Sequence, residues 1–91
     1  MHVRVYATLR DLLGTKSVTV ETDGETTVRQ VLRRLVAEYP SLADKLWDEE
    51  ENPTGYVTML LNGRSLEYLD GLDTLVGESD SLNLFPPVGG G

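Results

Sequence analysis

The residues most suited to chemistry stand at the end of the sequence, which reads LFPPVGGG from Leu84 to Gly91. Pro86 and Pro87 fix φ near −65° and favour an extended path, so they carry the chain away from the folded body. The glycines that follow have no Cβ atoms and fit into a slot too narrow for other residues. The reactive group predicted for this segment is the α-carboxylate of Gly91.

A carboxylate is a poor electrophile, and ATP makes it reactive by forming an acyl-adenylate. Sulfur then replaces an oxygen to give a thiocarboxylate, or an amine attacks to give an amide. The sequence has no Gly-Lys-Ser/Thr phosphate loop, so we expect ATP and Mg²⁺ to be supplied by a separate activating enzyme, with no cofactor bound by the chain itself. The competing interpretation of a glycine run is a flexible end or a cloning remnant.

Composition excludes several other kinds of site. The 91 residues contain no cysteine and one histidine, His2, which stands beside the N-terminus. Disulfide, thiolate and iron–sulfur chemistry are therefore excluded, and we predict no metal site and no Ser-His-Asp triad. A net charge of −7 argues against nucleic acid as a partner. The sequence has no long apolar run and no secretory leader pattern, so we expect no membrane partner and a cytoplasmic location.

The first half of the sequence predicts two strands followed by a helix. Apolar and polar residues alternate over 3–10 and again over 16–22, with Gly14 between them, which indicates an antiparallel hairpin. Apolar residues recur at helical spacing over 28–39, behind a capping box of Thr27 and Gln30. Ser41 and Asp44 suggest a second capping box for a short turn over 41–47, which would bury Leu42, Leu46 and Trp47.

The second half predicts a polar acidic loop over 48–55 and then further strands. A strand over 56–61 precedes the hairpin turn Asn62-Gly63, and a short edge strand over 64–69 follows. A turn-rich crossing over 70–81 would place Leu72, Leu75 and Val76 in the core, and the last strand covers 82–85. The acidic loop is interpreted as a solvated insertion, with a basic protein partner as the alternative.

This order of elements predicts the α+β class. We expect a mixed sheet of about five strands to grasp one main helix, with the last strand central beside the first, as in a β-grasp or ubiquitin-like fold. The predicted organisation is a β-grasp domain over 1–85 and an extended, flexible diglycine tail over 86–91.

Some surface residues remain open to two interpretations. Tyr6, Met59 and Leu61 are candidates for an exposed apolar patch on the outer side of the sheet, or alternatively for the core, and Tyr68 and Leu69 carry the same ambiguity. Three arginines on the exposed side of the helix are interpreted as a solvated face that pairs with Glu25 or Glu38, with a partner-binding role as the alternative; they are Arg29, Arg33 and Arg34.

Three stretches together resemble the MoaD/ThiS-like sulfur carriers, which include the small subunit of molybdopterin synthase. They read VYATLRDLLGTKSVTVE, TTVRQVLRRLVAEYPSL and YLDGLDTLVGESDSLNLFPPVGGG. The resemblance implies that Gly90-Gly91 is the family's terminal diglycine, with Gly91 adenylated and thiocarboxylated. Phe85, Pro86, Pro87, Val88, Gly89 and Gly90 would thread into the partner; Gly89 stands where alanine is common.

The implied function is sulfur delivery for molybdopterin, in the biosynthesis of the molybdenum or tungsten cofactor. The chain would then be no enzyme but a carrier subunit. Its implied partners are an E1-like adenylating enzyme of the MoaB/MoeB/ThiF type and a MoaE-like large subunit, with docking on the outer side of the sheet near the last strand. Small archaeal modifiers, which are joined to target lysines, and carriers for cysteine synthesis also resemble the chain, so conjugation to lysines is the alternative. The recipient pathway, the oligomeric state and whether Gly91 is a trimmed end stay open.

Overall fold

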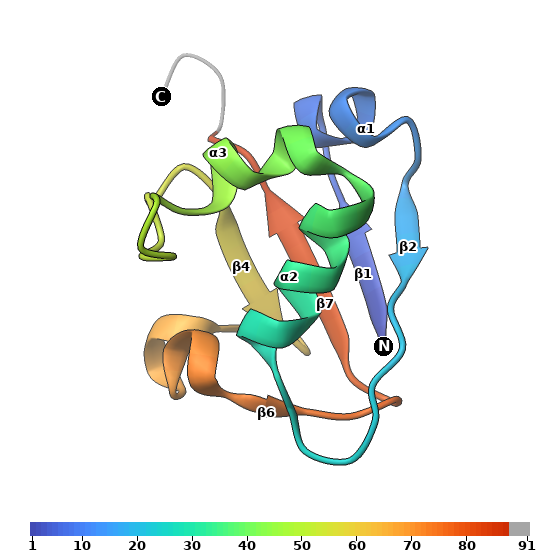
Figure 1. The fold of residues 1–91 in the computed structure, drawn as a ribbon, viewed down its shortest axis with the longest axis vertical. Helices are drawn as coiled ribbons and strands as arrows, with labels where there is room; N and C mark the ends of the chain where they lie inside the picture. The colour runs from blue at the N-terminus through green and yellow to red at the C-terminus, as the bar shows by residue number, and fades with distance from the viewer. Residues whose placement is uncertain (88–91) are drawn as a thin grey trace.

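A mixed five-stranded sheet forms one layer of the molecule, and the computed structural model describes it within residues 1–87 (Figure 1). Its strands are β1 (His2–Val5), β2 (Ser17–Thr19), β4 (Thr58–Leu61), β5 (Arg64–Ser65) and β7 (Ser81–Phe85). The order across the sheet is β2-β1-β7-β4-β5. The β1–β7 pair is parallel and the other pairs are antiparallel. The last strand is therefore central and lies beside the first, as predicted.

Helix α2 (Val28–Glu38) crosses one face of this sheet (Figure 1). The predicted capping box is present: Gln30 N–H donates to Thr27 Oγ1 at 3.2 Å, and Thr27 N–H donates to Gln30 Oε1 at 2.9 Å. These bonds satisfy amides that the first helical turn leaves free, which fixes the start of the helix. The helix and the mixed sheet confirm the β-grasp, ubiquitin-like fold.

The core lies between α2 and the inner face of the sheet. Alternation along each strand sends every second side chain inward, and the helix adds its apolar stripe. The inward residues of the central strands are Val3, Val5, Met59, Leu61, Leu82 and Leu84, and those of the helix are Val28, Val31, Leu32 and Leu35. Met59 and Leu61 are thus core residues, which decides between the two interpretations left open by their sequence.

The first connection differs from the prediction. The strand predicted over 3–10 ends at Val5, and residues Thr8–Leu13 form helix α1. Leu9 and Leu13 of this helix are both buried. Residues four apart lie on one face of a helix, so both leucines reach the core from a helix and not from the strand that the apparent alternation through Leu9 predicted. Gly14, with φ of 75°, closes α1 in the left-handed conformation that favours glycine.

The second predicted capping box was wrong. After α2 the chain forms a 3-10 turn, η1 (Pro40–Leu42), and then α3 (Ala43–Leu46), and neither has a side-chain cap. Proline at the first position of η1 starts the turn without help from Ser41. Leu42, Leu46 and Trp47 are buried as expected.

The hairpin after β4 turns at Asn62-Gly63, both with positive φ (51° and 84°), as the sequence predicts. The return strand is shorter than the predicted 64–69, because the chain leaves β5 after Ser65 and enters the 3-10 turn η2 (Leu66–Tyr68). A third 3-10 turn, η3 (Gly71–Asp73), follows. Within residues 1–87 no helix is long and apolar enough to cross a membrane.

A small second sheet lies near the start of α2, where β3 (Thr26–Thr27) pairs with β6 (Leu75–Val76). Leu72 and Val76 enter the core as predicted, whereas Leu75 does not and is 60% exposed. Residues 75 and 76 are successive in a strand, so their side chains point to opposite faces and only one of them reaches the core.

Candidate functional site

The candidate site is the end of β7, where the chain leaves the sheet. Both neighbours hold the strand here: Leu84 is in register with Val5 of β1, and Phe85 is in register with Thr58 of β4. The N–H of Tyr6 donates to the carbonyl of Leu84 at 3.2 Å. The strand is therefore paired on both sides as far as Leu84, and its final residue, Phe85, is paired with β4.

An aromatic pair covers this end of the sheet. The rings of Tyr6 and Phe85 stack with centroids 4.2 Å apart and planes 12° apart. The Tyr6 hydroxyl donates to Asn83 Oδ1 at 3.3 Å, and the Arg10 guanidinium lies 5.3 Å from the Tyr6 ring centre. Both rings are half-buried, so the pair holds the last residue of the strand and still offers an apolar surface to a partner.

Beyond Phe85 the exposure of the chain rises. Pro86 is half-buried and Pro87 is exposed, which fits a segment that runs outward from the domain. The remaining predicted site residues, Val88, Gly89, Gly90 and Gly91, lie outside the described residues. The assignment of 86–91 as a separate tail and of Gly91 as the reacting residue stays a prediction.

A basic hollow lies next to the aromatic pair, and the sequence analysis missed it. Its volume is about 230 Å³, and it is lined by Arg4, Val5, Tyr6, Arg10, Lys16 and Ser17. Arg10 Nε–H also donates to the carbonyl of Val5 at 3.0 Å, which positions that guanidinium at the sheet end. The sequence signal for this hollow was the presence of Arg4 and Arg10 in one predicted strand. Lys16 comes beside them only because α1 turns the chain back and β2 pairs with β1. The hollow suits a carboxylate from a partner.

The opposite end of β7 is held by a polar network. Asn62 Nδ2–H donates to Asp80 Oδ1 at 2.9 Å, and Ser81 N–H donates to Asn62 Oδ1 at 2.9 Å. Gly77 N–H donates to Asp80 Oδ2 at 2.8 Å. The hydrogen bond from Asn62 and then that from Gly77 lower the pKa of Asp80, because both favour its charged form. This network sets the register at which β7 begins.

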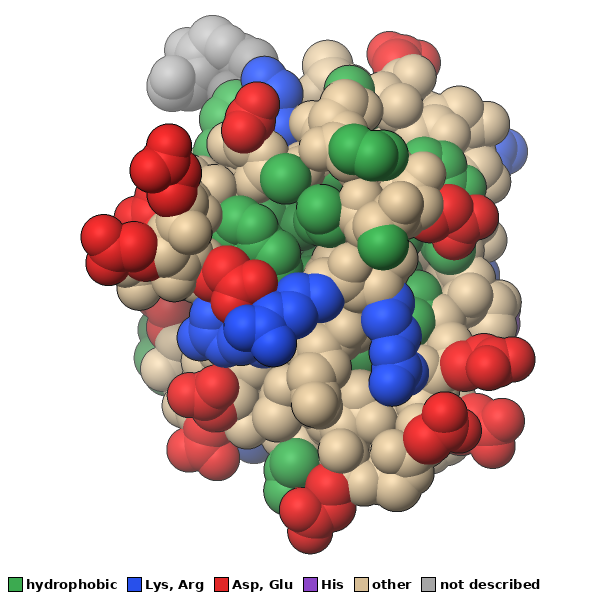
Figure 2. All heavy atoms as spheres, in the orientation of Figure 1, with side chains coloured by type: hydrophobic (Ala, Val, Ile, Leu, Met, Phe, Trp, Pro, Cys, Tyr) green, Lys and Arg blue, Asp and Glu red, His purple; other side chains and the backbone are tan. Residues whose placement is uncertain are grey.

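The acidic loop is tied to the helix, and the predicted pairing of the arginines with Glu25 or Glu38 was wrong. Arg33 contacts Glu51 through two hydrogen bonds, and Arg29 NH1 donates to the carbonyl of Glu51 at 3.0 Å. The hydrogen bond from Arg33 lowers the pKa of Glu51, while Arg34 donates to the carbonyl of Glu21. Figure 2 shows basic and acidic side chains in contact over the front of α2. Glu51 has a positive φ of 61° in this loop.

The remaining candidates lie away from the exit of β7. Tyr68 is 81% exposed and Leu69 packs partly against the core. His2 is exposed on β1. Within residues 1–87, no three His, Asp or Glu side chains gather closely enough to hold a metal ion.

Comparison with known proteins places this geometry in a family. The family model described as "ThiS family" matches residues 3–91. Small archaeal modifier protein 3 of Haloferax volcanii is 41% identical over 91 residues, which are 100% of this chain and 98% of the relative. Small archaeal modifier protein 1 of the same organism is 31% identical over the full length of both chains. Its crystal structure superposes with a TM-score of 0.87 over 100% of this chain and 98% of that one.

A bacterial structure extends the likeness. The crystal structure of CysO from Mycobacterium tuberculosis superposes with a TM-score of 0.80 at 27% identity, covering 96% of this chain and 98% of that one. These relatives are small ubiquitin-like carriers or modifiers rather than catalytic enzymes. The chain therefore belongs to the ThiS family of ubiquitin-like sulfur carriers and protein modifiers.

Proposed function

We propose that this protein is a ubiquitin-like modifier that is activated at Gly91 and joined to lysines of target proteins. The observation that carries the proposal is the full-length identity of 41% to a protein named as a small archaeal modifier, on a fold in which the central strand leads into Pro86-Pro87. A strand paired on both sides is a rigid base for a slender reactive end.

The chemistry begins on a separate E1-like enzyme that binds ATP and Mg²⁺. The Gly91 carboxylate attacks the α-phosphate of ATP, which forms the acyl-adenylate and releases pyrophosphate. A lysine amine then attacks the acyl carbon and expels AMP, giving an amide. The chain supplies the acyl group and its presentation, and the catalytic groups belong to the partner. Docking of the activating enzyme uses the exposed parts of Tyr6 and Phe85, with a partner carboxylate in the basic hollow.

Sulfur carriage is the second candidate. It is favoured by the match to the ThiS family model and by the likeness to CysO from Mycobacterium tuberculosis. On this path hydrosulfide attacks the acyl carbon of the same adenylate, AMP leaves, and Gly91 ends as a thiocarboxylate. A MoaE-like large subunit would then accept the sulfur for molybdopterin. Both functions share the adenylation step and differ in the nucleophile that follows.

The test is the intact mass of the protein isolated from its native cell, together with immunoblots for larger species. Modification predicts higher-mass conjugates that disappear when Gly90 and Gly91 are deleted. Sulfur carriage predicts a free form with one oxygen exchanged for one sulfur. The matched control is Gly89→Ala, which keeps the terminal diglycine and should behave as the unaltered protein. If Gly91 is intact and neither conjugates nor a sulfur-containing form is detected, both functions are contradicted.

A further inference from the structure

The turn between β4 and β5 carries an inference separate from the tail. Asn62 is followed by glycine, whereas the other two asparagines of the sequence, Asn52 and Asn83, precede Pro53 and Leu84. An asparagine deamidates when the main-chain nitrogen of the next residue attacks its side-chain carbonyl carbon. Glycine leaves that nitrogen unhindered, proline has no N–H to lose, and leucine crowds the approach. Asn62 is therefore the asparagine whose sequence favours this reaction most.

The reaction has two steps and consumes only water. The Gly63 nitrogen bonds to Cγ of Asn62, the bond from Cγ to Nδ2 breaks, and the released amide group takes the Gly63 proton and leaves as ammonia. Water then opens the cyclic imide. The product is aspartate, or isoaspartate when the main chain comes to run through the side-chain carbon, and either one adds a negative charge to the turn.

In the folded chain both polar atoms of the Asn62 side chain are already engaged. Nδ2–H donates to Asp80 Oδ1 at 2.9 Å, and Oδ1 accepts from the N–H of Ser81 at 2.9 Å. These two bonds fix the plane of the amide toward residues 80 and 81, so Cγ can meet the Gly63 nitrogen only after both have opened. The carboxylate of Asp80 opposes the reaction as well, because the attacking nitrogen is anionic.

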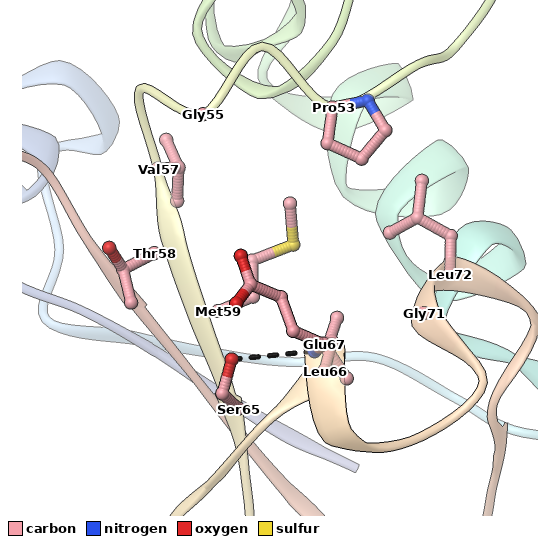
Figure 3. Close-up of a pocket in the computed structure, with 10 residues that line it drawn as sticks. All are labelled: Pro53, Gly55, Val57, Thr58, Met59, Ser65, Leu66, Glu67, Gly71 and Leu72. Carbon is pink, nitrogen blue, oxygen red and sulfur yellow. Dashed lines mark hydrogen bonds between the residues drawn. The ribbon is translucent and has the colours of Figure 1, made fainter.

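The rest of the hairpin is held independently of this network. Its two arms pair at Leu61 and Arg64. Beyond the turn, Ser65 Oγ accepts from the N–H of Glu67 at 3.4 Å (Figure 3). Met59, buried on β4, extends into a hollow of about 210 Å³ between this strand and the turns η2 and η3 (Figure 3). The side chain of Asn62 can therefore be released while the hairpin stays paired.

We propose that Asn62 is a deamidation site protected by its bonds to Asp80 and Ser81, and that its conversion releases the start of β7. In the aspartate product a second carboxylate faces Asp80 where a 2.9 Å hydrogen bond stood, so the two groups repel each other. In the isoaspartate product the main chain of the turn is one atom longer, which alters the turn geometry that sets the register of the hairpin. Neither product returns to asparagine, so the altered form accumulates with the age of the protein.

The first test is ageing of the full chain in a mildly alkaline buffer, followed by peptide mapping of the three asparagines by mass spectrometry. We expect wild type to convert Asn62 slowly, and Asp80→Ala to convert it about three- to tenfold faster, as the loss of one hydrogen bond of the network implies. Asn52 and Asn83 are internal references and should stay unchanged.

The matched control is Glu78→Ala. Glu78 is an exposed acid before β7, and the bonds of Asn62 go to Asp80 and Ser81 instead. This variant changes the net charge as Asp80→Ala does and should leave the rate unchanged. Equal acceleration by both variants, or none by Asp80→Ala, would overturn the protection by the network. Faster conversion at another asparagine would overturn the site.

Leu84→Ala separates release of the side chain from unfolding of the chain. It removes a fully buried side chain at the far end of β7 and leaves the bonds of Asn62 in place. At a temperature where circular dichroism shows every variant folded, its rate should stay within about twofold of wild type, because distant sites act independently. Acceleration equal to that of Asp80→Ala would assign the reaction to the unfolded chain and overturn the proposal.

The effect on the strand is tested with Asn62→Asp, which makes the aspartate product directly. In hydrogen-exchange NMR, the amides of residue 62 and Ser81 should exchange about three- to tenfold faster than in wild type. The amide of Tyr6, which donates to the carbonyl of Leu84 at the far end of the strand, should keep its rate. An equal change at both ends would show a general loss of stability, and no change at residue 62 and Ser81 would show that the strand stays in place; either result overturns the proposed release.

Discussion

The two ends of the central strand are held by different chemistry. At its start, Asn62, Asp80 and Ser81 form a polar network of short hydrogen bonds. At its end, the stacked rings of Tyr6 and Phe85 hold the chain beside a basic hollow. Directional hydrogen bonds fix a register, whereas a half-exposed stack also leaves an apolar surface available to a partner. The docking of an activating enzyme that we propose therefore concerns the end of β7 that leads to Pro86.

The largest expected effect is a loss of stability in the core. It tests whether the two ends of β7 differ only on the outer face of the sheet. Leu82 and Leu84 point inward at the two ends of β7 and are both fully buried. Either leucine replaced by alanine should lower the free energy of unfolding by about 2–5 kcal/mol, as measured by urea titration. The control Leu75→Ala, at an exposed leucine, should change it by less than about 0.5 kcal/mol. A large difference between the two buried sites would show that the ends also differ inside the core.

The start of the strand should depend on Asn62. Asn62→Ala removes the amide that serves both Asp80 and Ser81 and places alanine at a φ of 51°. We expect a loss of about 1–3 kcal/mol in unfolding free energy, because two hydrogen bonds at an exposed site are lost and alanine is strained at a positive φ. Asn62→Gly relieves the backbone strain but lacks the amide, so it separates the two contributions. Full stability of Asn62→Gly would contradict a role for the side-chain bonds.

The end of the strand should depend on the stacked pair. A double-mutant cycle of Tyr6→Leu and Phe85→Leu should give a coupling energy of about 0.5–1.5 kcal/mol, the range for aromatic pairs. The measurement is chemical denaturation of the wild type, both single variants and the double variant. The cycle Tyr6→Leu with Leu75→Ala should show no coupling, because Tyr6 follows β1 of the five-stranded sheet whereas Leu75 lies on β6 of the small second sheet.

The smallest effect concerns pH. The pKa of Asp80 is lowered in the folded protein by hydrogen bonds from Asn62 and Gly77. A lowered folded pKa adds stability above the unfolded pKa of 3.8, and that stability is lost as the pH falls through the folded value. Asp80→Asn should therefore reduce the loss of stability on acidification below about pH 4. The matched variant Glu78→Gln, an exposed acid nearby, provides the comparison, and an equal change in both would rule out the network as the cause.

The sequence predicted the parts of the fold that depend on local pattern. The α2 stripe, the Thr27–Gln30 capping box and the Asn62-Gly63 turn all follow from residues close together in the chain, and the structure confirms them. The central place of the last strand followed from the order of elements. Gly91 and the segment from Val88 lie outside the described residues, so the reactive part of the site remains a prediction.

The errors arose where two patterns or distant residues compete. The stretch through Leu9 and Leu13 fits a strand in one reading and a helix in another, and packing of both leucines against the core decided for the helix. Arg33 pairs with Glu51, which lies in a loop far along the chain, and not with an acid on its own helix. The basic hollow likewise depends on β1–β2 pairing that joins Arg4 with Ser17. Such contacts are set by tertiary structure, which local spacing does not encode.

The parallel pairing of β1 with β7 also has a mechanical consequence. The N-terminal end of β1 and the outgoing end of β7 lie at opposite ends of the sheet (Figure 1). Tension between Met1 and Pro86 would therefore slide the two strands past each other in shear. All hydrogen bonds of the pair would bear the load together, rather than opening one at a time as in a zipper. An enzyme that unfolded the protein by pulling on the segment after β7 would load the sheet in the direction in which it resists force most strongly.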